Sequence, residues 1–272
     1  MSDVSRELIE RSGYALEGFP AVYDSARPSP PASVVDILCH LARVERPRLV
    51  VDLGCGTGLS TRAWAARANE VVGVEGNPAM AAQARAATSA ANVRFVDALA
   101  AATGLAGAAV DVVTVAQAFH WMEPQPVLRE AARLLRPGGL FAAYDYDWPP
   151  AIEPELDEAF AAHHEARGEA RRRLALVERA GTDRKQRHLD EIRASGLFRS
   201  ARELVCHGWD DVDYARVVGL AESIGGPREI FGDEAPAVRE TFERLRETAA
   251  RALGGRTVPM LLGYRIRVGV RP

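Results

Sequence analysis

Apolar residues in the first half of the chain follow two alternating patterns. Short apolar runs, typical of buried strands, occupy residues 50–53, 70–75, 93–98, 110–116 and 140–145. Segments between these runs carry apolar residues at helical spacing, as in 29–41 and 126–135. Strands that alternate with helices form a parallel, doubly wound sheet with helices on both faces. We therefore expect an α/β fold of that kind.

The second half of the chain is expected to complete the sheet and to add helices. Residues 149–186 are rich in Glu, Ala and Arg and lack a strand pattern, which predicts a helical insertion. A strand at 202–207, two amphipathic helices, the first capped by Asp210 or Asp211, and an alternating last strand at 258–270 follow. Since no repeat or linker interrupts the chain, we expect one domain over residues 1–272. Within it, residues 1–31 would form an N-terminal lid and residues 149–186 a helical cap.

The first apolar run ends at an acid and breaks into three alternating glycines, Gly54, Gly56 and Gly58, before a helical segment. Glycine permits positive φ and a close approach of ligand to backbone, and the free N–H groups of a helix start face that ligand. A nucleoside-bearing cofactor is the expected occupant. The dinucleotide fingerprint G-x-G-x-x-G would require its third glycine at position 59, where Leu59 stands.

With Asp52, the glycines form a D-x-G-x-G-x-G pattern that resembles motif I of the class I S-adenosylmethionine (SAM)-dependent methyltransferases. Later landmarks follow in the family's order: Glu75, Asp97 and the Pro137-Gly138-Gly139 turn. The resemblance implies a seven-stranded, Rossmann-like sheet, mostly parallel with an antiparallel last strand. It also implies SAM as cofactor and S-adenosylhomocysteine as product.

Several residues have expected roles in holding that cofactor. Glu75 ends the second strand, where a carboxylate accepts both ribose hydroxyls. The resemblance implies that Asp97 reads the adenine amino group and that Ala98 meets the ring. Arg27-Pro28 resembles the upstream SAM-carboxylate contact of methyltransferases related to trans-aconitate methyltransferase, although Arg27 also fits as a surface arginine. The full expected set is Arg27, Asp52, Gly54, Gly56, Glu75, Gly76, Met80, Asp97, Ala98 and Gln117, and Asn77 is expected to cap the next helix.

His120 follows the fourth strand and is the candidate catalytic residue. A hydroxyl acceptor needs a base, and imidazole has a suitable pKa, whereas a carboxylate attacks unaided. A structural role for His120 is the alternative. We assign Asp145 and Asp147 to packing and capping, and the adjacent His163 and His164 to a solvated helix face, so we expect no metal.

Composition and charge limit the classes of partner that we expect for the protein. A net charge of −3 with scattered arginines disfavours nucleic acid, three isolated cysteines indicate a reducing compartment, and a polar start without a long apolar run indicates a cytoplasmic protein. We expect a small-molecule acceptor and no membrane partner, and the oligomeric state, monomer or dimer, stays open. The sequence favours methyl transfer to an oxygen of an organic acid or natural-product intermediate. The alternative is a SAM-fold binding or regulatory protein, or a catalyst of natural-product biosynthesis that does not methylate.

Overall fold

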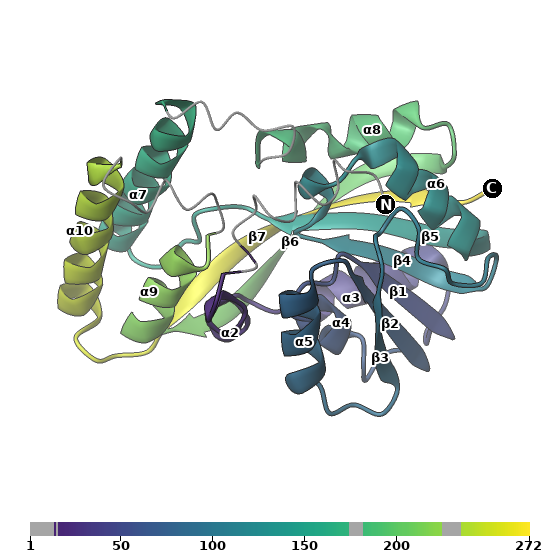
Figure 1. The fold of residues 1–272 in the computed structure, drawn as a ribbon, viewed down its shortest axis with the longest axis horizontal. Coiled ribbons are helices and arrows are strands. Elements are labelled where there is room, and N and C mark those ends of the chain that lie inside the picture. The colour runs from purple at the N-terminus through teal and green to yellow at the C-terminus, as the bar shows by residue number, and fades with distance from the viewer. Residues whose placement is uncertain (1–13, 15, 174–181, 225–234) are drawn as a thin grey trace.

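The computed structural model describes residues 14, 16–173, 182–224 and 235–272. Its centre is a seven-stranded sheet in the order β3-β2-β1-β4-β5-β7-β6 (Figure 1). The strands are β1 Leu49–Leu53, β2 Glu70–Glu75, β3 Val93–Asp97, β4 Val110–Ala116, β5 Leu135–Tyr146, β6 Arg199–Val212 and β7 Val258–Val270. Strands β1 to β5 pair in parallel, and β7 runs antiparallel to both β5 and β6. The expected mixed sheet with an antiparallel last strand is confirmed.

Alternate residues of the strands belong to two separate hydrophobic clusters. Val50 belongs to a cluster that includes buried residues of α3 (Ala32–Ala42), whereas Val51 belongs to one that includes residues of α6 (Pro124–Leu134). Because successive side chains of a strand point to opposite faces, both faces of the sheet are covered. The short helices α4 (Leu59–Ala63) and α5 (Pro78–Ala86) follow β1 and β2, so their N-terminal ends lie at the carboxyl edge of the sheet.

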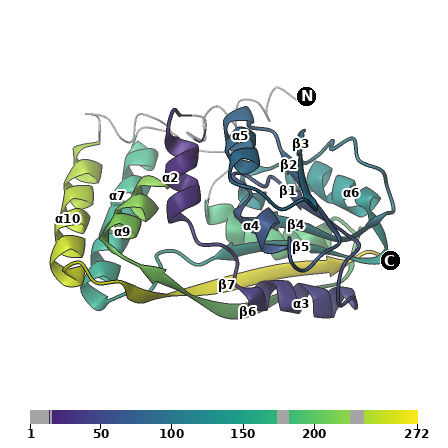
Figure 2. The same cartoon turned by 90° about the horizontal axis from the view of Figure 1, so that it is seen from below.

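A second group of helices stands beside the extended ends of β6 and β7 (Figure 2). It comprises α2 (Phe19–Ala26), α7 (Pro154–Arg173), α9 (Tyr214–Glu222) and α10 (Pro236–Leu253). Helix α7 belongs to the expected 149–186 insertion and packs against α10. The η2 turn (Thr182–Arg187) and α8 (His188–Ala194) return the chain to the sheet. Residues 1–13 and 15 of the expected lid and residues 174–181 of the expected cap lie outside the described residues, so the closing role of both segments stays a prediction.

Three local expectations are wrong. Strand β6 is longer than 202–207 because it pairs with β7 as far as Val212, so Asp210 and Asp211 lie in the strand. Asp213 caps α9 instead and accepts the backbone N–H of Arg216 at 2.8 Å. Helix α3 starts after Pro31 and not at residue 29. His163 is 2 % exposed and contacts Thr241 of α10, because helix packing buries this side of α7.

Candidate active site

The carboxyl edge of the parallel strands is hollowed by a first cavity of about 460 Å³. Gly54 and Gly56 adopt φ of +65° and +57° there, and a Cβ on Gly54 would collide with the side chain of Met122. Glycine is therefore required where the loop leaves β1. The cavity lining contains most of the expected cofactor residues: Arg27, Gly54, Gly56, Glu75, Gly76, Met80 and Gln117.

Glu75 joins the two loops that border this cavity. One carboxylate oxygen accepts the backbone N–H of Gly56 and the other accepts that of Asn77, both at 2.8 Å. Burial raises the pKa of Glu75, and the backbone hydrogen bonds oppose that rise. Asn77 caps α5 by accepting the N–H groups of Ala79 and Met80, so its expected role as a cap is confirmed. Each oxygen of Glu75 retains capacity for a ligand hydroxyl.

Asp52 lies outside the cavity lining. It is fully buried, and its two oxygens accept the hydroxyls of Thr61 and Thr114, each at 2.7 Å. Burial raises the pKa of Asp52, and these hydroxyls oppose the rise. The acid therefore ties β1 to α4 and β4, and so positions the glycine loop without facing a ligand.

Asp97 and Ala98 are likewise not part of the cavity lining. The Asp97 carboxylate is exposed and pairs with Arg85 at 2.8 Å. The neighbouring residues 99–102 line the cavity in their place. The structure thus does not bring Asp97 to the other expected contacts, and its adenine role stays a prediction.

Arg27 follows α2 and reaches Ser223 after α9 and Tyr146 at the end of β5, instead of lying on the open surface. Its guanidinium donates to Tyr146 at 2.6 Å and to Ser223 at 2.7 and 2.8 Å. The Arg27 Cζ atom lies 4.8 Å from the ring centroid of Trp148 and 5.1 Å from that of Tyr23. The guanidinium is therefore held at the cavity wall by neutral partners, in a geometry typical of cation–π contacts.

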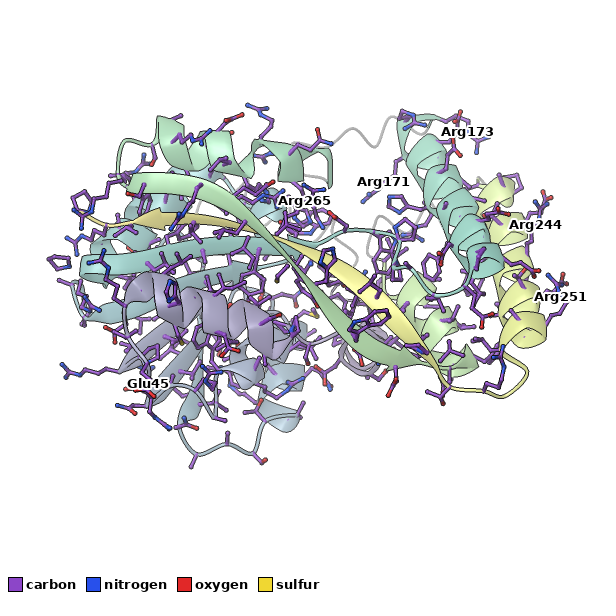
Figure 3. The ribbon with its side chains drawn as sticks, turned by 180° about the vertical axis from the view of Figure 1, so that it is seen from behind. Glu45, Arg171, Arg173, Arg244, Arg251 and Arg265 are labelled. Atoms are coloured by element: carbon purple, nitrogen blue, oxygen red, sulfur yellow. The ribbon has the colours of Figure 1, made fainter. Side chains whose placement is uncertain are left out.

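A second cavity, of about 620 Å³, adjoins the first. The two share lining residues Tyr14, Tyr23, Arg27, Gln117, Trp121 and Tyr146. Five cationic side chains line the second cavity, namely Arg27, Arg171, Lys185, Arg265 and Arg267, against three carboxylates, Asp145, Asp147 and Glu203. Arg244 and Arg251, by contrast, point outward on α10, whereas Arg171 points toward the interior (Figure 3).

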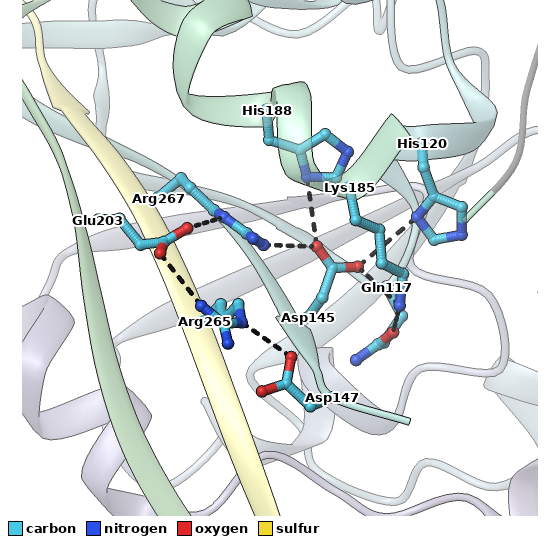
Figure 4. Close-up of polar contacts among 9 residues, drawn as sticks. All are labelled: Gln117, His120, Asp145, Asp147, Lys185, His188, Glu203, Arg265 and Arg267. Atoms are coloured by element: carbon cyan, nitrogen blue, oxygen red, sulfur yellow. Dashed lines mark hydrogen bonds and ion pairs between the residues drawn. The ribbon is translucent and has the colours of Figure 1, made fainter. Parts of the chain in front are cut away.

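Asp145, which is 3 % exposed, is the centre of this ionic cluster (Figure 4). Its carboxylate lies 3.2 Å from Arg267, 3.3 Å from His188, 3.4 Å from Lys185 and 3.6 Å from His120. Burial favours a higher pKa for Asp145, but the Lys185 ammonium and the two nearby histidines outweigh it and hold the pKa well below its usual value. Asp145 therefore stays ionised inside the protein.

The assignment of Asp145 and Asp147 to packing and capping is wrong. Asp147 pairs with Arg265 at 2.9 Å, and Arg265 also reaches Glu203, which in turn pairs with Arg267 at 2.6 Å. The two acids belong to one chain of charges across β5, β7 and β6. Among the described residues, no group of three or more His, Cys, Asp and Glu side chains is placed to hold a metal ion.

His120 lies in a turn after β4, lines the second cavity and is 4 % exposed. Burial lowers the pKa of His120 to about 4, although Asp145 favours its charged form. The imidazole is therefore neutral at pH 7. A group with this pKa is a weak acceptor for a hydroxyl proton, because general bases work best with a pKa near the operating pH.

Comparison with known proteins places residues 51–143 in a family described as the methyltransferase domain. An uncharacterized methyltransferase of Mycobacterium tuberculosis is 40 % identical over 119 residues, which cover 43 % of this chain and 46 % of that protein. The trans-aconitate 2-methyltransferase of Methylobacterium radiotolerans is 39 % identical over 107 residues, 38 % of this chain and 40 % of that protein. Residues 51–143 of the chain therefore carry a methyltransferase domain.

The likeness in fold extends beyond the matched segment. A solved methyltransferase structure from Anaeromyxobacter dehalogenans, described as type II, superposes with a TM-score of 0.58 at 22 % identity, over 90 % of this chain and 97 % of the other. The chain spans about half the length of the curated relatives it matches or less, so its acceptor is a matter for proposal. No helix among the described residues is long and apolar enough to cross a membrane.

Sequence reasoning missed Lys185, His188 and Arg267 of the second cavity region. Motif analysis gave no reason to connect them, because η2, α8 and β7 come together only in the fold. One signal was present for Lys185. It is the only lysine in a chain with 34 basic residues, and that lysine lies beside Asp145 with 20 % of its side chain exposed.

The low pKa of His120 makes the stability of the protein depend on pH. The folded pKa of about 4 lies below the unfolded value of about 6.5, so the unfolded chain binds more protons between these values. Stability from this group is complete above pH 6.5 and falls as the pH drops toward 4. We expect the protonation of His120 to lower the free energy of unfolding by about 3 kcal/mol across that window. Urea unfolding at a series of pH values measures this loss.

His163, whose pKa burial also lowers to about 4, adds its own dependence, so the comparison must be made with a variant. The His120→Gln protein should lose less stability than the wild type over the same window. Equal losses in the two proteins would contradict the assignment of this pKa to His120.

Proposed function

We propose that the chain transfers a methyl group from SAM to a carboxylate oxygen of a small organic acid. The observation that carries the proposal is the second cavity, which adjoins the first along shared residues and has more cationic than acidic side chains in its lining. Cations in a partly dehydrated cavity favour an anionic ligand, because burying their charge without a counter-charge is costly.

The first cavity fits the cofactor on its own geometry. The glycine loop leaves room that a Cβ would fill, and Glu75 offers acceptor positions for ribose hydroxyls. Each terminal nitrogen of Arg27 donates one described hydrogen bond and carries a second hydrogen, which suits the methionine carboxylate. Met80 and Gly76 border the same space.

The chemistry favours a carboxylate over a hydroxyl acceptor. SAM supplies a methyl group on a positively charged sulfur, a carboxylate oxygen forms the new C–O bond with a lone pair, and the C–S electron pair stays on sulfur. The positive and negative charges cancel, so no proton has to move. A hydroxyl would have to lose a proton, and His120 is too weakly basic for that task at neutral pH. The chain's task is to align the two reactants and exclude water.

The proposal includes a cytoplasmic site of action, which the three free cysteines support. In this proposal His120 has a structural role beside Asp145 and takes no part in the methyl transfer.

The test is turnover with a matched panel of acceptors. We expect S-adenosylhomocysteine to form with small carboxylic acids, trans-aconitate among them because one relative bears that name, and the product to be a methyl ester. The acids' methyl esters and the corresponding alcohols serve as blocked controls. The rate should stay flat between about pH 6 and 8, because neither the acids nor His120 titrate there.

Turnover confined to hydroxyl compounds, with a rate that rises with pH, would contradict the carboxylate assignment. SAM binding without turnover on any member of the panel would favour the alternative of a binding or regulatory protein.

A further inference from the structure

We propose that Lys185 fixes the side-chain amide of Gln117 with its NH₂ group toward the meeting point of the two cavities, where it holds the second oxygen of the acceptor carboxylate. Gln117 then determines the acceptor class, and Lys185 is its positioning residue. The inference rests on the proposed function and adds to it the group that orients the acceptor.

The contact between the two side chains sets the direction of the amide. The Nζ atom of Lys185 lies 3.0 Å from Oε1 of Gln117. An ammonium group only donates hydrogen bonds, so the amide atom that meets it must be the oxygen. This settles an orientation that amide geometry alone leaves open. The NH₂ group accordingly points away from Lys185.

The NH₂ group lacks a partner within the described protein. The Nε2 atom of Gln117 is buried and has no hydrogen-bond partner among the described residues, and Gln117 lines both cavities. A buried donor left without a partner is costly, and native proteins rarely retain one without a reason. A ligand oxygen at the meeting point of the cavities satisfies this donor.

The backbone of Gln117 supports a functional role. Its φ is +53°, a left-handed conformation that non-glycine residues seldom adopt, and its N–H donates to the carbonyl of Tyr144 at 2.9 Å. Such conformations cluster at ligand-binding sites, where the surrounding structure holds them. Here the conformation places the side chain between the two cavities.

The ionic cluster anchors Lys185. Its Nζ atom lies 3.4 Å from Asp145, which Arg267 and two histidines hold from other sides. Asp145 thereby compensates the buried ammonium and restricts where it can lie. A lysine is a compact charge with three donors, so it can meet Gln117 and Asp145 together, which the planar fork of arginine does less readily. The retention of lysine in a chain otherwise rich in arginine agrees with this need.

A carboxylate matches the arrangement. One acceptor oxygen forms the C–O bond to the methyl group while the C–S pair remains on sulfur, and the other oxygen accepts an Nε2–H hydrogen of Gln117. The hydrogen bond lasts through the transfer, and no proton leaves or arrives. An ester or amide of the same acid lacks the anionic oxygen that would attack.

A double-mutant cycle tests whether Lys185 acts through Gln117. With trans-aconitate as the first acceptor probe, or else the acid of the panel with the highest turnover, Lys185→Met should lower kcat/KM by about 10- to 100-fold, the scale of a hydrogen bond to a charged group. The Kd for S-adenosylhomocysteine should change less than about twofold, because the first cavity is intact. In a Gln117→Ala background, the same Lys185→Met change should have almost no further effect.

Equal losses from Lys185→Met in both backgrounds would overturn the proposal. Arg187→Met is the matched control, because Arg187 lies two residues away in the same turn with its side chain 70 % exposed, and it should leave kcat/KM unchanged. If Gln117→Ala folds poorly, Gln117→Gly serves in its place, since glycine accepts the left-handed backbone.

A second measurement needs no acceptor. In protein labelled with ¹⁵N at its glutamine side chains, the NH₂ signals of Gln117 are those missing from Gln117→Glu. Lys185→Met should shift and broaden them, whereas Arg187→Met should not. Signals unchanged by Lys185→Met would overturn the positioning role. A wild-type protein that methylates no acid would instead overturn the proposed function, so the two failures are distinguishable.

Discussion

Replacing Asp145 with alanine should lower the free energy of unfolding by about 3 to 5 kcal/mol, the usual cost of removing one partner from a buried ionic network. Asp145 is 3 % exposed and faces Lys185 and Arg267, and Arg267 is itself 3 % exposed. Without the carboxylate, Lys185 loses its acidic partner, and Arg267 retains only Glu203 at 2.6 Å. The expected loss is the cost of desolvated charge and not the net value of an ion pair. Urea unfolding followed by circular dichroism measures it.

Two further variants separate the effect of the buried charge from the effects of side-chain volume and of exposure. Asp145→Asn keeps the shape of the side chain but removes its charge, so it should show most of the same loss. Asp147→Ala is the matched control on the same strand end, because its carboxylate is half exposed and, among the described residues, pairs with the exposed side chain of Arg265 alone. Exposed pairs contribute about 0 to 1 kcal/mol. A similar loss for Asp145→Ala and Asp147→Ala would contradict the view that burial makes Asp145 decisive.

The strands of the parallel half were predictable from the sequence because each of them contains a short apolar run with a clear end. Strands β2 and β3 start where the pattern predicted, and β7 matches the alternation over 258–270. What the pattern missed lies where tertiary pairing overrides local preference. Strand β6 runs through Asp210 and Asp211 because β7 supplies a partner for each residue, although acids there resemble a helix cap.

Much of the lining of the first cavity was predictable for a related reason. Its residues follow strand ends in order along a short part of the chain, so a motif can report them. The second cavity draws on α7, η2, β6 and β7, which are distant in sequence from Gln117 and His120. No spacing rule connects Lys185 with Asp145, and burial of His163 depended on the packing of α7 against α10. Only the rarity of lysine marked Lys185 in advance.

Removing the carboxylate of Glu75 should weaken the binding of S-adenosylhomocysteine by about 2 kcal/mol or more, roughly 30-fold. Glu75 is proposed to accept the ribose hydroxyls, and hydrogen bonds to a charged acceptor are stronger than neutral ones. The same carboxylate accepts the N–H groups of Gly56 and Asn77, so Glu75→Ala also leaves two donors of the cavity wall without their partner. Isothermal titration calorimetry measures the change, with thermal melting to show that the variant is folded.

Asp97→Ala provides a matched comparison, because Asp97 ends the neighbouring strand and pairs with Glu75 in the sheet register. Its side chain is exposed, bonded to Arg85 and absent from the cavity lining, so its removal should weaken binding less than that of Glu75. Glu75→Gln should fall between the two, since an amide oxygen still accepts a hydrogen bond but carries no charge. Unchanged affinity in folded Glu75→Ala would refute the ribose role. A loss for Asp97→Ala as large as that for Glu75→Ala would show that Asp97 turns toward the cofactor when it binds, as the family resemblance implies.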